Sequence, residues 1–346
     1  MKPFETLTHL GRGRQLRPYA IKLLKDRFGI QAVTLQQVAE SVNIVFRAVT
    51  QDQKRCVLRL TPPGHFHDRC DVDSEIAWID SLCQAGIGVP HVIQARNGET
   101  VISMRWDGIP GQWHCVVFEW IQARELATCW RDANIYRYGQ LLAQLHVAGA
   151  RFTPPKGFRV RSAATVFPHC DPAFEKAEPF VLFDKIPKDL VPPARRKLFE
   201  RALDLAQGEI SRLFESGTPQ PIHNDLHPWN VMINRFEIFA IDFENMLMGF
   251  PVQDVGTTLN YFRNYVKDEM PYEDRLAVFR KGYESVRPWP EEFPGQVQLM
   301  SASHRLMLCN FYAAHRDPEY REFATIVFKR VEARIKEDLA VVEMRC

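Results

Sequence analysis

A cluster of polar side chains lies between residues 221 and 244, in the stretch PIHNDLHPWNVMINRFEIFAIDFE. Asp225 precedes Asn230 by five residues, and Asp242 follows an alternating apolar run. Alternation around Asn234-Arg235 predicts two short strands joined by a tight turn, which would place Asn230 and Asp242 side by side. A carboxylate and an amide oxygen suit Mg²⁺, and a further carboxylate can orient a hydroxyl and accept its proton. The spacing therefore predicts phosphoryl transfer, with Asp225 as base and Asn230 and Asp242 as metal ligands.

The spacing His-x-Asp-x-x-x-x-Asn, followed by Ile-Asp-Phe-Glu, is the catalytic-loop pattern of kinase-fold enzymes. Here it covers residues 223–230 and 241–244. The segment resembles the aminoglycoside phosphotransferase and choline kinase-like family (the phosphotransferase enzyme family), and within it the branch of the bacterial RdoA-type stress kinases. The resemblance covers residues 30–320. It implies a two-lobed α+β fold like that of protein kinases, with a small antiparallel-sheet lobe and a mainly helical lobe.

Other residues of the loop have expected roles or leave alternatives open. His223 is expected to brace the loop by hydrogen bonding, and His227 to shield it. Glu244 stands where protein kinases carry the glycine of Asp-Phe-Gly, and it could reach a second Mg²⁺ or a cationic substrate, or have a solvated or structural role. Asn224 and Trp229 replace residues that are often glycine in the family, so the acceptor is left open.

The nucleotide site is expected in the N-terminal part of the chain. Residues 44–60 predict an antiparallel hairpin. By resemblance, the turn with Ser41 and Asn43 replaces the glycine-rich loop over the phosphates and offers them N–H groups. Arg59 stands where the family carries a lysine that contacts phosphates and pairs with a helix glutamate, and the alternative is a plain surface arginine. Glu75 is then its partner or, alternatively, a first-turn glutamate that favours the helix dipole.

The apolar run VVFEW predicts a buried strand that leads to the link between the lobes. By resemblance, adenine would bind there through backbone hydrogen bonds near Glu119 and Ile121. The expected domains are an N-terminal nucleotide-binding lobe (1–117), a hinge (118–124) and a helical catalytic and substrate lobe (125–346).

Apolar periodicity predicts the helices, and Gly11 and Gly13 are expected in a flexible N-terminal turn. Asp73 or Ser74 is expected to cap its helix. The expected helices are 17–28, 73–84, a segment ending at 146, 194–215, a segment starting at 254, 272–286, 296–316 and 320–343. His146 is expected to be a core histidine bonded to the backbone or to the catalytic loop. In the family Asp254 supports that loop from behind, and a helix cap is the alternative.

Composition excludes several classes of protein. A length of 346 residues favours two domains. A formal charge of +2 does not indicate binding to nucleic acid or to an acidic membrane. No apolar run reaches the ~18 residues of a membrane span, and no secretion signal is visible at the N-terminus. Eight cysteines fall singly, which indicates reduced thiols in a cytoplasmic protein, although a zinc site assembled from distant residues stays open.

The residues and the resemblance together predict a Mg²⁺-dependent phosphotransferase that uses ATP, or GTP, to phosphorylate a hydroxyl group of a small molecule. One alternative is an RdoA-like Ser/Thr protein kinase; the chain lacks an Ala-Pro-Glu motif, but so do the RdoA-type kinases. Another is a nucleotide-binding regulator without catalysis, because Arg59 replaces the usual lysine. The oligomeric state is left open.

Overall fold

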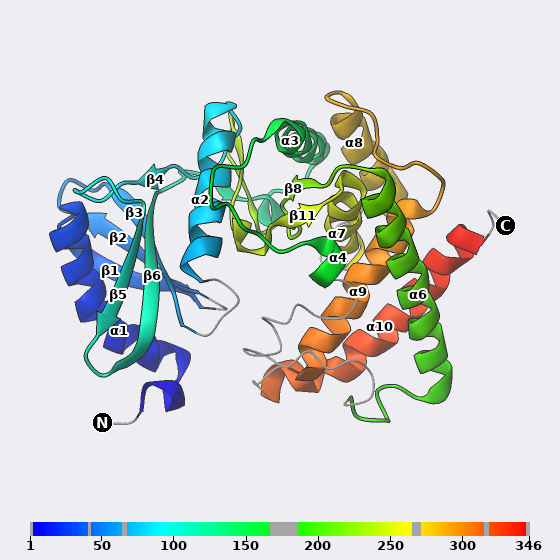
Figure 1. Cartoon of the computed structure of the whole chain (residues 1–346), viewed down its shortest axis with the longest axis horizontal. Helices are drawn as coiled ribbons and strands as arrows, with labels where there is room; N and C mark the ends of the chain where they lie inside the picture. Colours follow the sequence, from blue (N-terminus) through cyan, green and yellow to red (C-terminus); the bar gives the residue numbers. More distant parts are fainter. Residues whose placement is uncertain are drawn as a thin grey trace. The chain divides into compact units, whose positions relative to one another are not determined.

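The computed structural model describes residues 3–40, 43–63, 68–166, 186–264, 271–314 and 318–343. The chain divides into two compact units (Figure 1). The first unit consists of Met1–Gln122 and Pro154–Arg159, and the second of Ala123–Thr153 and Val160–Cys346. The expected hinge, 118–124, contains the point where the chain passes from the first unit to the second.

The first unit is built on a six-stranded sheet in which all the pairings are antiparallel. The strand order is β1-β2-β3-β6-β4, and β5 also pairs with β6. The predicted hairpin is confirmed, because β2 pairs with β3 from Ile44 opposite Leu60 to Val49 opposite Arg55. The strands are β1 (Ala32–Glu40), β2 (Ile44–Thr50), β3 (Arg55–Thr61), β4 (Val92–Ile93), β5 (Val101–Trp106) and β6 (Ile109–Glu119).

Helix α1 (His9–Leu23) lies against β1 and starts earlier than its sequence predicts (Figure 1). It continues into a π-helical turn, η2 (Leu24–Phe28), and ends at Gly29, whose φ of 72° is left-handed. The expectation of a flexible turn at Gly11 and Gly13 is wrong, since both lie inside α1. Gly13 packs closely against β1: a Cβ would lie 1.7 Å from Oε1 of Gln37, so the end of that side chain would have to move.

Helix α2 (Arg69–Gln84) begins one turn before the predicted start. Its cap is Asp68 and not Asp73 or Ser74: the Asp68 carboxylate accepts from the N–H groups of Cys70 and Asp71, and Asp71 bonds back to Asp68. This capping box satisfies N–H groups that have no partner within the helix. Ser74 instead accepts, at 2.8 Å, the N–H of Arg159, which belongs to the same unit.

The second unit is mainly helical, and its helices match the predicted ones within a few residues at most of their ends. Helix α3 packs on α8, and α9 packs on both α7 and α10 (Figure 1). Glycines allow the first contact, because a Cβ on Gly282 of α8 would lie 2.0 Å from the carbonyl oxygen of Tyr136 on α3. The helices are α3 (Asp132–Arg151), α4 (Ala163–Val166), α6 (Pro193–Ser216), α7 (Pro251–Asn264), α8 (Tyr272–Glu284), α9 (Gln296–Ala314) and α10 (Pro318–Glu343).

Two small antiparallel sheets complete this unit and carry the polar stretch. One has the order β10-β9-β7, and the other pairs β11 with β8. The predicted hairpin around Asn234 is confirmed: its Oδ1 accepts from the N–H groups of Phe236 and Glu237, both at 2.8 Å. The strands are β7 (Arg124–Glu125), β8 (Gln220–Ile222), β9 (Val231–Ile233), β10 (Ile238–Ala240) and β11 (Leu247–Gly249), and the short helices are η1 (Phe4–Thr6), η3 (Leu126–Thr128) and η4 (Phe243–Asn245).

The cysteines are free thiols throughout the described ranges, as their spacing predicts; Cys170 and Cys346 lie outside those ranges. None of the helices in the described ranges combines the length and the apolar composition that a membrane-crossing helix needs.

Candidate active site

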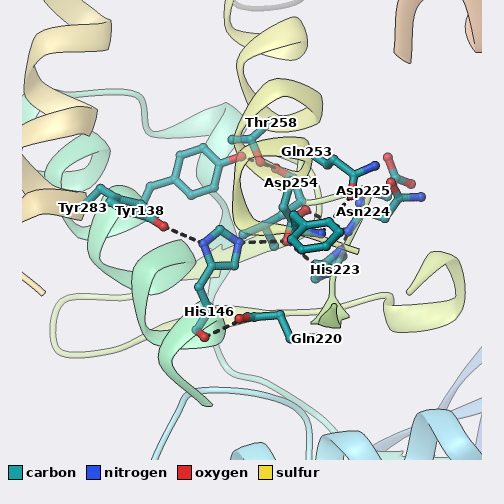
Figure 2. Close-up of polar contacts among 12 residues, drawn as sticks. Tyr138, His146, Gln220, His223, Asn224, Asp225, Gln253, Asp254, Thr258 and Tyr283 are labelled. Carbon is teal, nitrogen blue, oxygen red and sulfur yellow. Dashed lines mark hydrogen bonds and ion pairs between the residues drawn. The ribbon is translucent and has the colours of Figure 1, made fainter. Parts of the chain in front are cut away.

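The loop that connects β8 to β9 is held by Asp254, in the first turn of α7 (Figure 2). The Asp254 carboxylate accepts the backbone N–H groups of His223, at 2.9 Å, and Asn224, at 2.8 Å. Asn224 has a φ of 63°, a left-handed conformation that asparagine tolerates better than most residues. The predicted support of the loop from behind by Asp254 is therefore confirmed, and the loop's backbone is fixed by a fully buried carboxylate.

Asp254 is in turn held by a chain of buried groups from two other helices. His146 of α3 donates from Nε2 to Asp254 at 3.2 Å, and its Nδ1 lies 2.7 Å from the Tyr283 hydroxyl of α8 (Figure 2). Burial lowers the pKa of His146, so the imidazole is neutral. Burial opposes ionisation of Asp254, but its hydrogen bonds hold its pKa below the usual value. His146 is the predicted core histidine, and its partner is the carboxylate that carries the loop.

Asp225 is oriented by two side chains that sequence reasoning missed. Its Oδ1 accepts from the Tyr261 hydroxyl at 3.2 Å, and its Oδ2 from Nδ2 of Asn245 at 3.1 Å. Burial raises the pKa of Asp225 to about 7, against the opposing effect of these two hydrogen bonds. Tyr261 could have been found from spacing, because residues 254, 258 and 261 lie at i, i+4 and i+7 on one face of α7.

His223 braces the loop, as predicted, through both ring nitrogens. Its Nε2 donates to the carbonyl oxygen of Ile241 at 3.1 Å, and its Nδ1 accepts the N–H of Asp225 at 3.3 Å. Burial lowers its pKa to about 4, so the ring stays neutral near pH 7 and keeps this tautomer. The ring therefore connects the Asp225 loop to the strand end that precedes Asp242.

The two predicted metal ligands stand at neighbouring strand ends. The N–H of Ile241 donates to the carbonyl oxygen of Asn230 at 2.9 Å, and Nδ2 of Asn230 donates to the carbonyl oxygen of Asp225 at 3.0 Å. Asn230 is buried, whereas Asp242 is exposed and has a φ of 67°. Asn230 therefore links the backbone of Asp225 to Ile241, the residue before Asp242. That Asn230 and Asp242 hold a metal ion stays a prediction.

The chemistry of the two predicted ligands, Asn230 and Asp242, determines which kind of metal ion they suit. An asparagine Oδ1 and an aspartate carboxylate are hard oxygen donors, which suit a cation that keeps several waters. No cluster of three or more His, Cys, Asp or Glu side chains forms a metal cage in the described part of the chain. Glu244, in η4, is buried, so its predicted solvated alternative is wrong.

His227 and Trp229 occupy the outer part of the loop. Nδ1 of His227 accepts the N–H of Asn230 at 3.1 Å, and its ring lies edge-on to Tyr261 with the centroids 4.9 Å apart. Trp229 is 37% exposed, so its bulk lies at the surface and not in the core.

In the first unit, Arg59 of β3 and Glu75 of α2 form a buried two-pronged ion pair. Arg59 donates from Nη1 to Oε1 at 2.7 Å and from Nη2 to Oε2 at 2.6 Å, and the residues are 6% and 4% exposed. The guanidinium also lies 5.5 Å from the centroid of the Phe118 ring. The alternatives of a surface arginine and of a glutamate serving only the helix dipole are therefore wrong.

The other residues that are predicted to bind the nucleotide make few contacts that bear on that role. Asn43 is buried and directly precedes β2, while Ser41 lies outside the described residues. Glu119 ends β6 and is exposed, and its backbone N–H donates to the carbonyl oxygen of His91 at 2.9 Å. Ile121 is half-buried. An adenine contact near Glu119 and Ile121 stays a prediction.

Solved structures resemble most of the chain. The microcompartment-associated aminopropanol kinase has a TM-score of 0.75 at 21% identity, covering 94% of this chain and 98% of that one. The spectinomycin phosphotransferase APH(9)-Ia, in complex with ADP and spectinomycin, has a TM-score of 0.63 at 15% identity, covering 93% and 98%. The kinase-like α+β fold predicted from the sequence, with an antiparallel-sheet unit and a mainly helical unit, is thereby confirmed.

Sequence comparison identifies the family. Amicoumacin kinase of Bacillus subtilis (strain 168) is 24% identical over 268 residues, which are 74% of this chain and 73% of that protein. The model of the phosphotransferase enzyme family matches residues 34–289, well over half of the chain. The RdoA-type branch stays a prediction. The catalytic-loop pattern, the fold and the family model agree: the chain belongs to the phosphotransferase enzyme family.

Proposed function

We propose that the protein transfers the γ-phosphoryl group of ATP, or of GTP, to a hydroxyl group of a small molecule. The observation that carries this proposal is the Asp225 carboxylate, whose two oxygens are held by Tyr261 and Asn245 on a loop fixed by Asp254. A fixed carboxylate beside hard oxygen donors is what in-line phosphoryl transfer requires, since catalysis there depends on positioning and charge neutralisation.

In the proposed reaction the acceptor oxygen forms a bond to the γ-phosphorus as the bond from that phosphorus to the β,γ-bridging oxygen breaks. The nucleoside diphosphate leaves with the electron pair of that bond. Asp225 orients the attacking hydroxyl, takes its proton, and releases the proton to water afterwards. A carboxylate whose pKa lies near 7 is suited to this exchange, because it can both accept and release a proton at neutral pH.

Asn230 and Asp242 would hold Mg²⁺, and Glu244 would be a further metal ligand or a structural residue. When bound, the cation neutralises charge on the β- and γ-phosphates. The support for these roles is the donor chemistry and the hydrogen bonds that join the two strand ends. His223 acts as a positioning residue, because both of its ring nitrogens are used by the backbone.

The nucleotide would be held by the first unit through Asn43, Arg59 and the backbone near Glu119 and Ile121. The Glu75 carboxylate fixes the Arg59 guanidinium, which as a permanent cation is suited to phosphate contact. Support for a nucleotide substrate also comes from similar solved structures: an amicoumacin kinase in complex with AMP-PNP, Ca²⁺ and amicoumacin, and a spectinomycin phosphotransferase in complex with ADP.

The decisive experiment measures Mg²⁺-dependent release of ADP with a panel of alcohols, amino alcohols, sugars and aminoglycosides. Asp225→Ala and Asp242→Ala should each lower kcat at least 1,000-fold, about 4 kcal/mol of barrier. Asp204→Ala removes an exposed carboxylate of α6 and is the matched control, with an unchanged rate. Full turnover in Asp225→Ala would refute the assignment.

The same assay separates the two alternative functions. A nucleotide-binding regulator would bind ATP but release no ADP that depends on Asp225. An RdoA-like protein kinase would transfer radiolabelled phosphate from ATP to a generic protein substrate in preference to every small alcohol of the panel.

A further inference from the structure

The imidazole ring of His227 is held in one orientation within the catalytic loop. Its Nδ1 accepts the backbone N–H of Asn230 at 3.1 Å, and the same N–H donates to the carbonyl oxygen of His227 at 2.8 Å. The ring lies edge-on to two aromatic rings, with its centroid 4.9 Å from that of Tyr261 and 5.7 Å from that of Trp229. Because Nδ1 accepts a hydrogen bond, it carries no proton, and the proton of the ring is on Nε2.

This Nε2–H group is a donor that the protein itself does not use. Within the described residues, the only hydrogen bond of the His227 side chain is the one at Nδ1. Nε2 is not among the polar atoms that are buried without a partner, so it is open to solvent in a half-buried residue. The other histidine and asparagine side chains of the loop donate to backbone carbonyl oxygens: His223 to Ile241 at 3.1 Å, Asn224 to Asn245 at 3.2 Å and Asn230 to Asp225 at 3.0 Å.

The unused donor belongs to a residue that contacts both parts of the proposed reaction centre. The backbone N–H of His227 donates to the carbonyl oxygen of Asp225 at 2.8 Å, and the neighbouring Tyr261 hydroxyl donates to the Asp225 carboxylate at 3.2 Å. On its other side, the ring accepts from Asn230, a proposed metal ligand. His227 therefore stands between the proposed base and the proposed metal ligand, where the transferring phosphoryl group would lie.

The chemistry of the donor favours a phosphoryl oxygen over a hydroxyl group as its partner. An N–H group can only donate, and the oxygens of a phosphoryl group need only donors, whereas the acceptor hydroxyl needs a group that takes its proton, which is the proposed role of Asp225. Residues 223–230 contain no Lys or Arg that could serve the phosphoryl group instead. A hydrogen bond to an anionic oxygen is also stronger than one to a neutral oxygen.

We propose that His227 is a further catalytic residue, whose Nε2–H donates to a non-bridging oxygen of the γ-phosphoryl group. This inference rests on the proposed phosphotransferase function and deepens it. The ring neither gains nor loses a proton in the reaction. It supplies a donor that is fixed before the reaction starts, at oxygens that carry the charge of the transition state.

Two variants separate this role from a purely structural one. In His227→Asn, the side-chain oxygen can stand near the position of Nδ1 and accept the Asn230 N–H, but no donor reaches the position of Nε2. In His227→Gln, the amide nitrogen can stand near the position of Nε2, while the acceptor at Nδ1 is lost. We expect kcat to fall about 100-fold in His227→Asn and less than about tenfold in His227→Gln.

A purely structural role predicts the opposite order, because His227→Asn keeps the hydrogen bond that holds the loop. A kcat in His227→Asn that equals or exceeds that of His227→Gln would therefore overturn the proposal. His9→Asn removes an exposed imidazole of α1 and is the matched control, with unchanged kinetics.

A second test does not depend on turnover. Isothermal titration calorimetry with Mg²⁺ compares AMP-PNP, which has a γ-phosphoryl group, with ADP, which has none. His227→Asn should raise the Kd for AMP-PNP about tenfold and leave the Kd for ADP within about twofold. Equal effects on the two nucleotides, no effect on either, or no binding of AMP-PNP by the wild type would overturn the proposal.

The two tests also distinguish this contact from the proposed function. If His227→Asn selectively weakens AMP-PNP and the wild type phosphorylates no acceptor, the contact stands and the proposed function fails. If the wild type transfers phosphate and His227→Asn binds AMP-PNP as tightly as the wild type does, the proposed function stands and the contact is wrong.

Discussion

The carboxylate of Asp254 holds the catalytic loop, and Asp254→Asn tests how strongly. In the protein, Asp254 accepts from the N–H groups of His223 and Asn224 and from Nε2 of His146. Asparagine keeps the size of the side chain but replaces one accepting oxygen with an NH₂ group, so at least one of these three donors is left without an acceptor. The remaining hydrogen bonds lose the assistance of the negative charge.

The expected cost follows from these contacts. An orphaned buried donor costs about 2 kcal/mol, and each of the two weakened bonds about 1 kcal/mol. Burying a neutral amide is less costly than burying a charge, which offsets part of this sum, so the free energy of unfolding should fall by about 3 kcal/mol. Loss of these hydrogen bonds should also let the loop move and displace Asp225. We therefore expect kcat to fall about 100-fold while the KM for ATP changes little.

Urea unfolding followed by circular dichroism measures the first effect, with an unchanged m-value as the check on two-state behaviour. Steady-state kinetics measure the second. Asp204→Asn removes the same charge from an exposed position of α6 and should leave both unchanged. If Asp254→Asn unfolds within about 0.5 kcal/mol of the wild type and keeps its kcat, Asp254 does not position the loop.

Three more predictions concern packing, the nucleotide unit and pH. Gly282→Ala should destabilise by about 2 kcal/mol in urea, because its Cβ would meet α3, whereas Gly208→Ala, with open space around it, should stabilise slightly; equal stabilities would contradict this contact. Arg59→Lys should raise the KM for ATP and lower Tm, because lysine cannot make both hydrogen bonds to Glu75. An unchanged KM for ATP would show that this ion pair does not contribute to nucleotide binding. The pKa of His223 is about 4 when folded against 6.5 for an ordinary histidine, so the unfolded chain binds more protons between these values. The free energy of unfolding should therefore fall by up to about 3 kcal/mol as the pH drops from 6.5 to 4, and a urea series in which His223→Gln shows the same decline would refute this.

The sequence predicted the two hairpins, because the signals for a hairpin lie within the residues that form it. The hairpin around Asn234 and the strands on either side of residues 51–54 follow from alternation and turn residues, and both are present. Strand β1 had no comparable signal: Leu35 is its only buried side chain, because the strand lies at an edge of the sheet. Gly13 looked like a turn residue because the side chain that it packs against, Gln37, lies on another element.

The same division applies to the site. Asp225, Asn230 and Asp242 stand in one short stretch at a spacing that physical chemistry can interpret, and Arg59 with Glu75 follows from a charge within a strand and a helix face. Asn245 acts through a contact between different elements, and nothing in its local sequence shows which carboxylate it faces. The spacing on α7 places Tyr261 on the face of Asp254, but it does not show that the Tyr261 hydroxyl reaches Asp225. Such partners emerge only when the helices are packed.

Because Asp254 accepts from backbone amides, its two hydrogen bonds to the β8–β9 loop do not depend on which side chains stand at positions 223 and 224. The side chain at position 224 can therefore be exchanged without loss of the hydrogen bond from its backbone to Asp254. Position 224 is the natural place for such exchange, within limits: its left-handed φ favours asparagine, aspartate, histidine or glycine. Substitution among these four residues would vary the side chain next to Asp225 while the backbone beneath it stays bonded to Asp254.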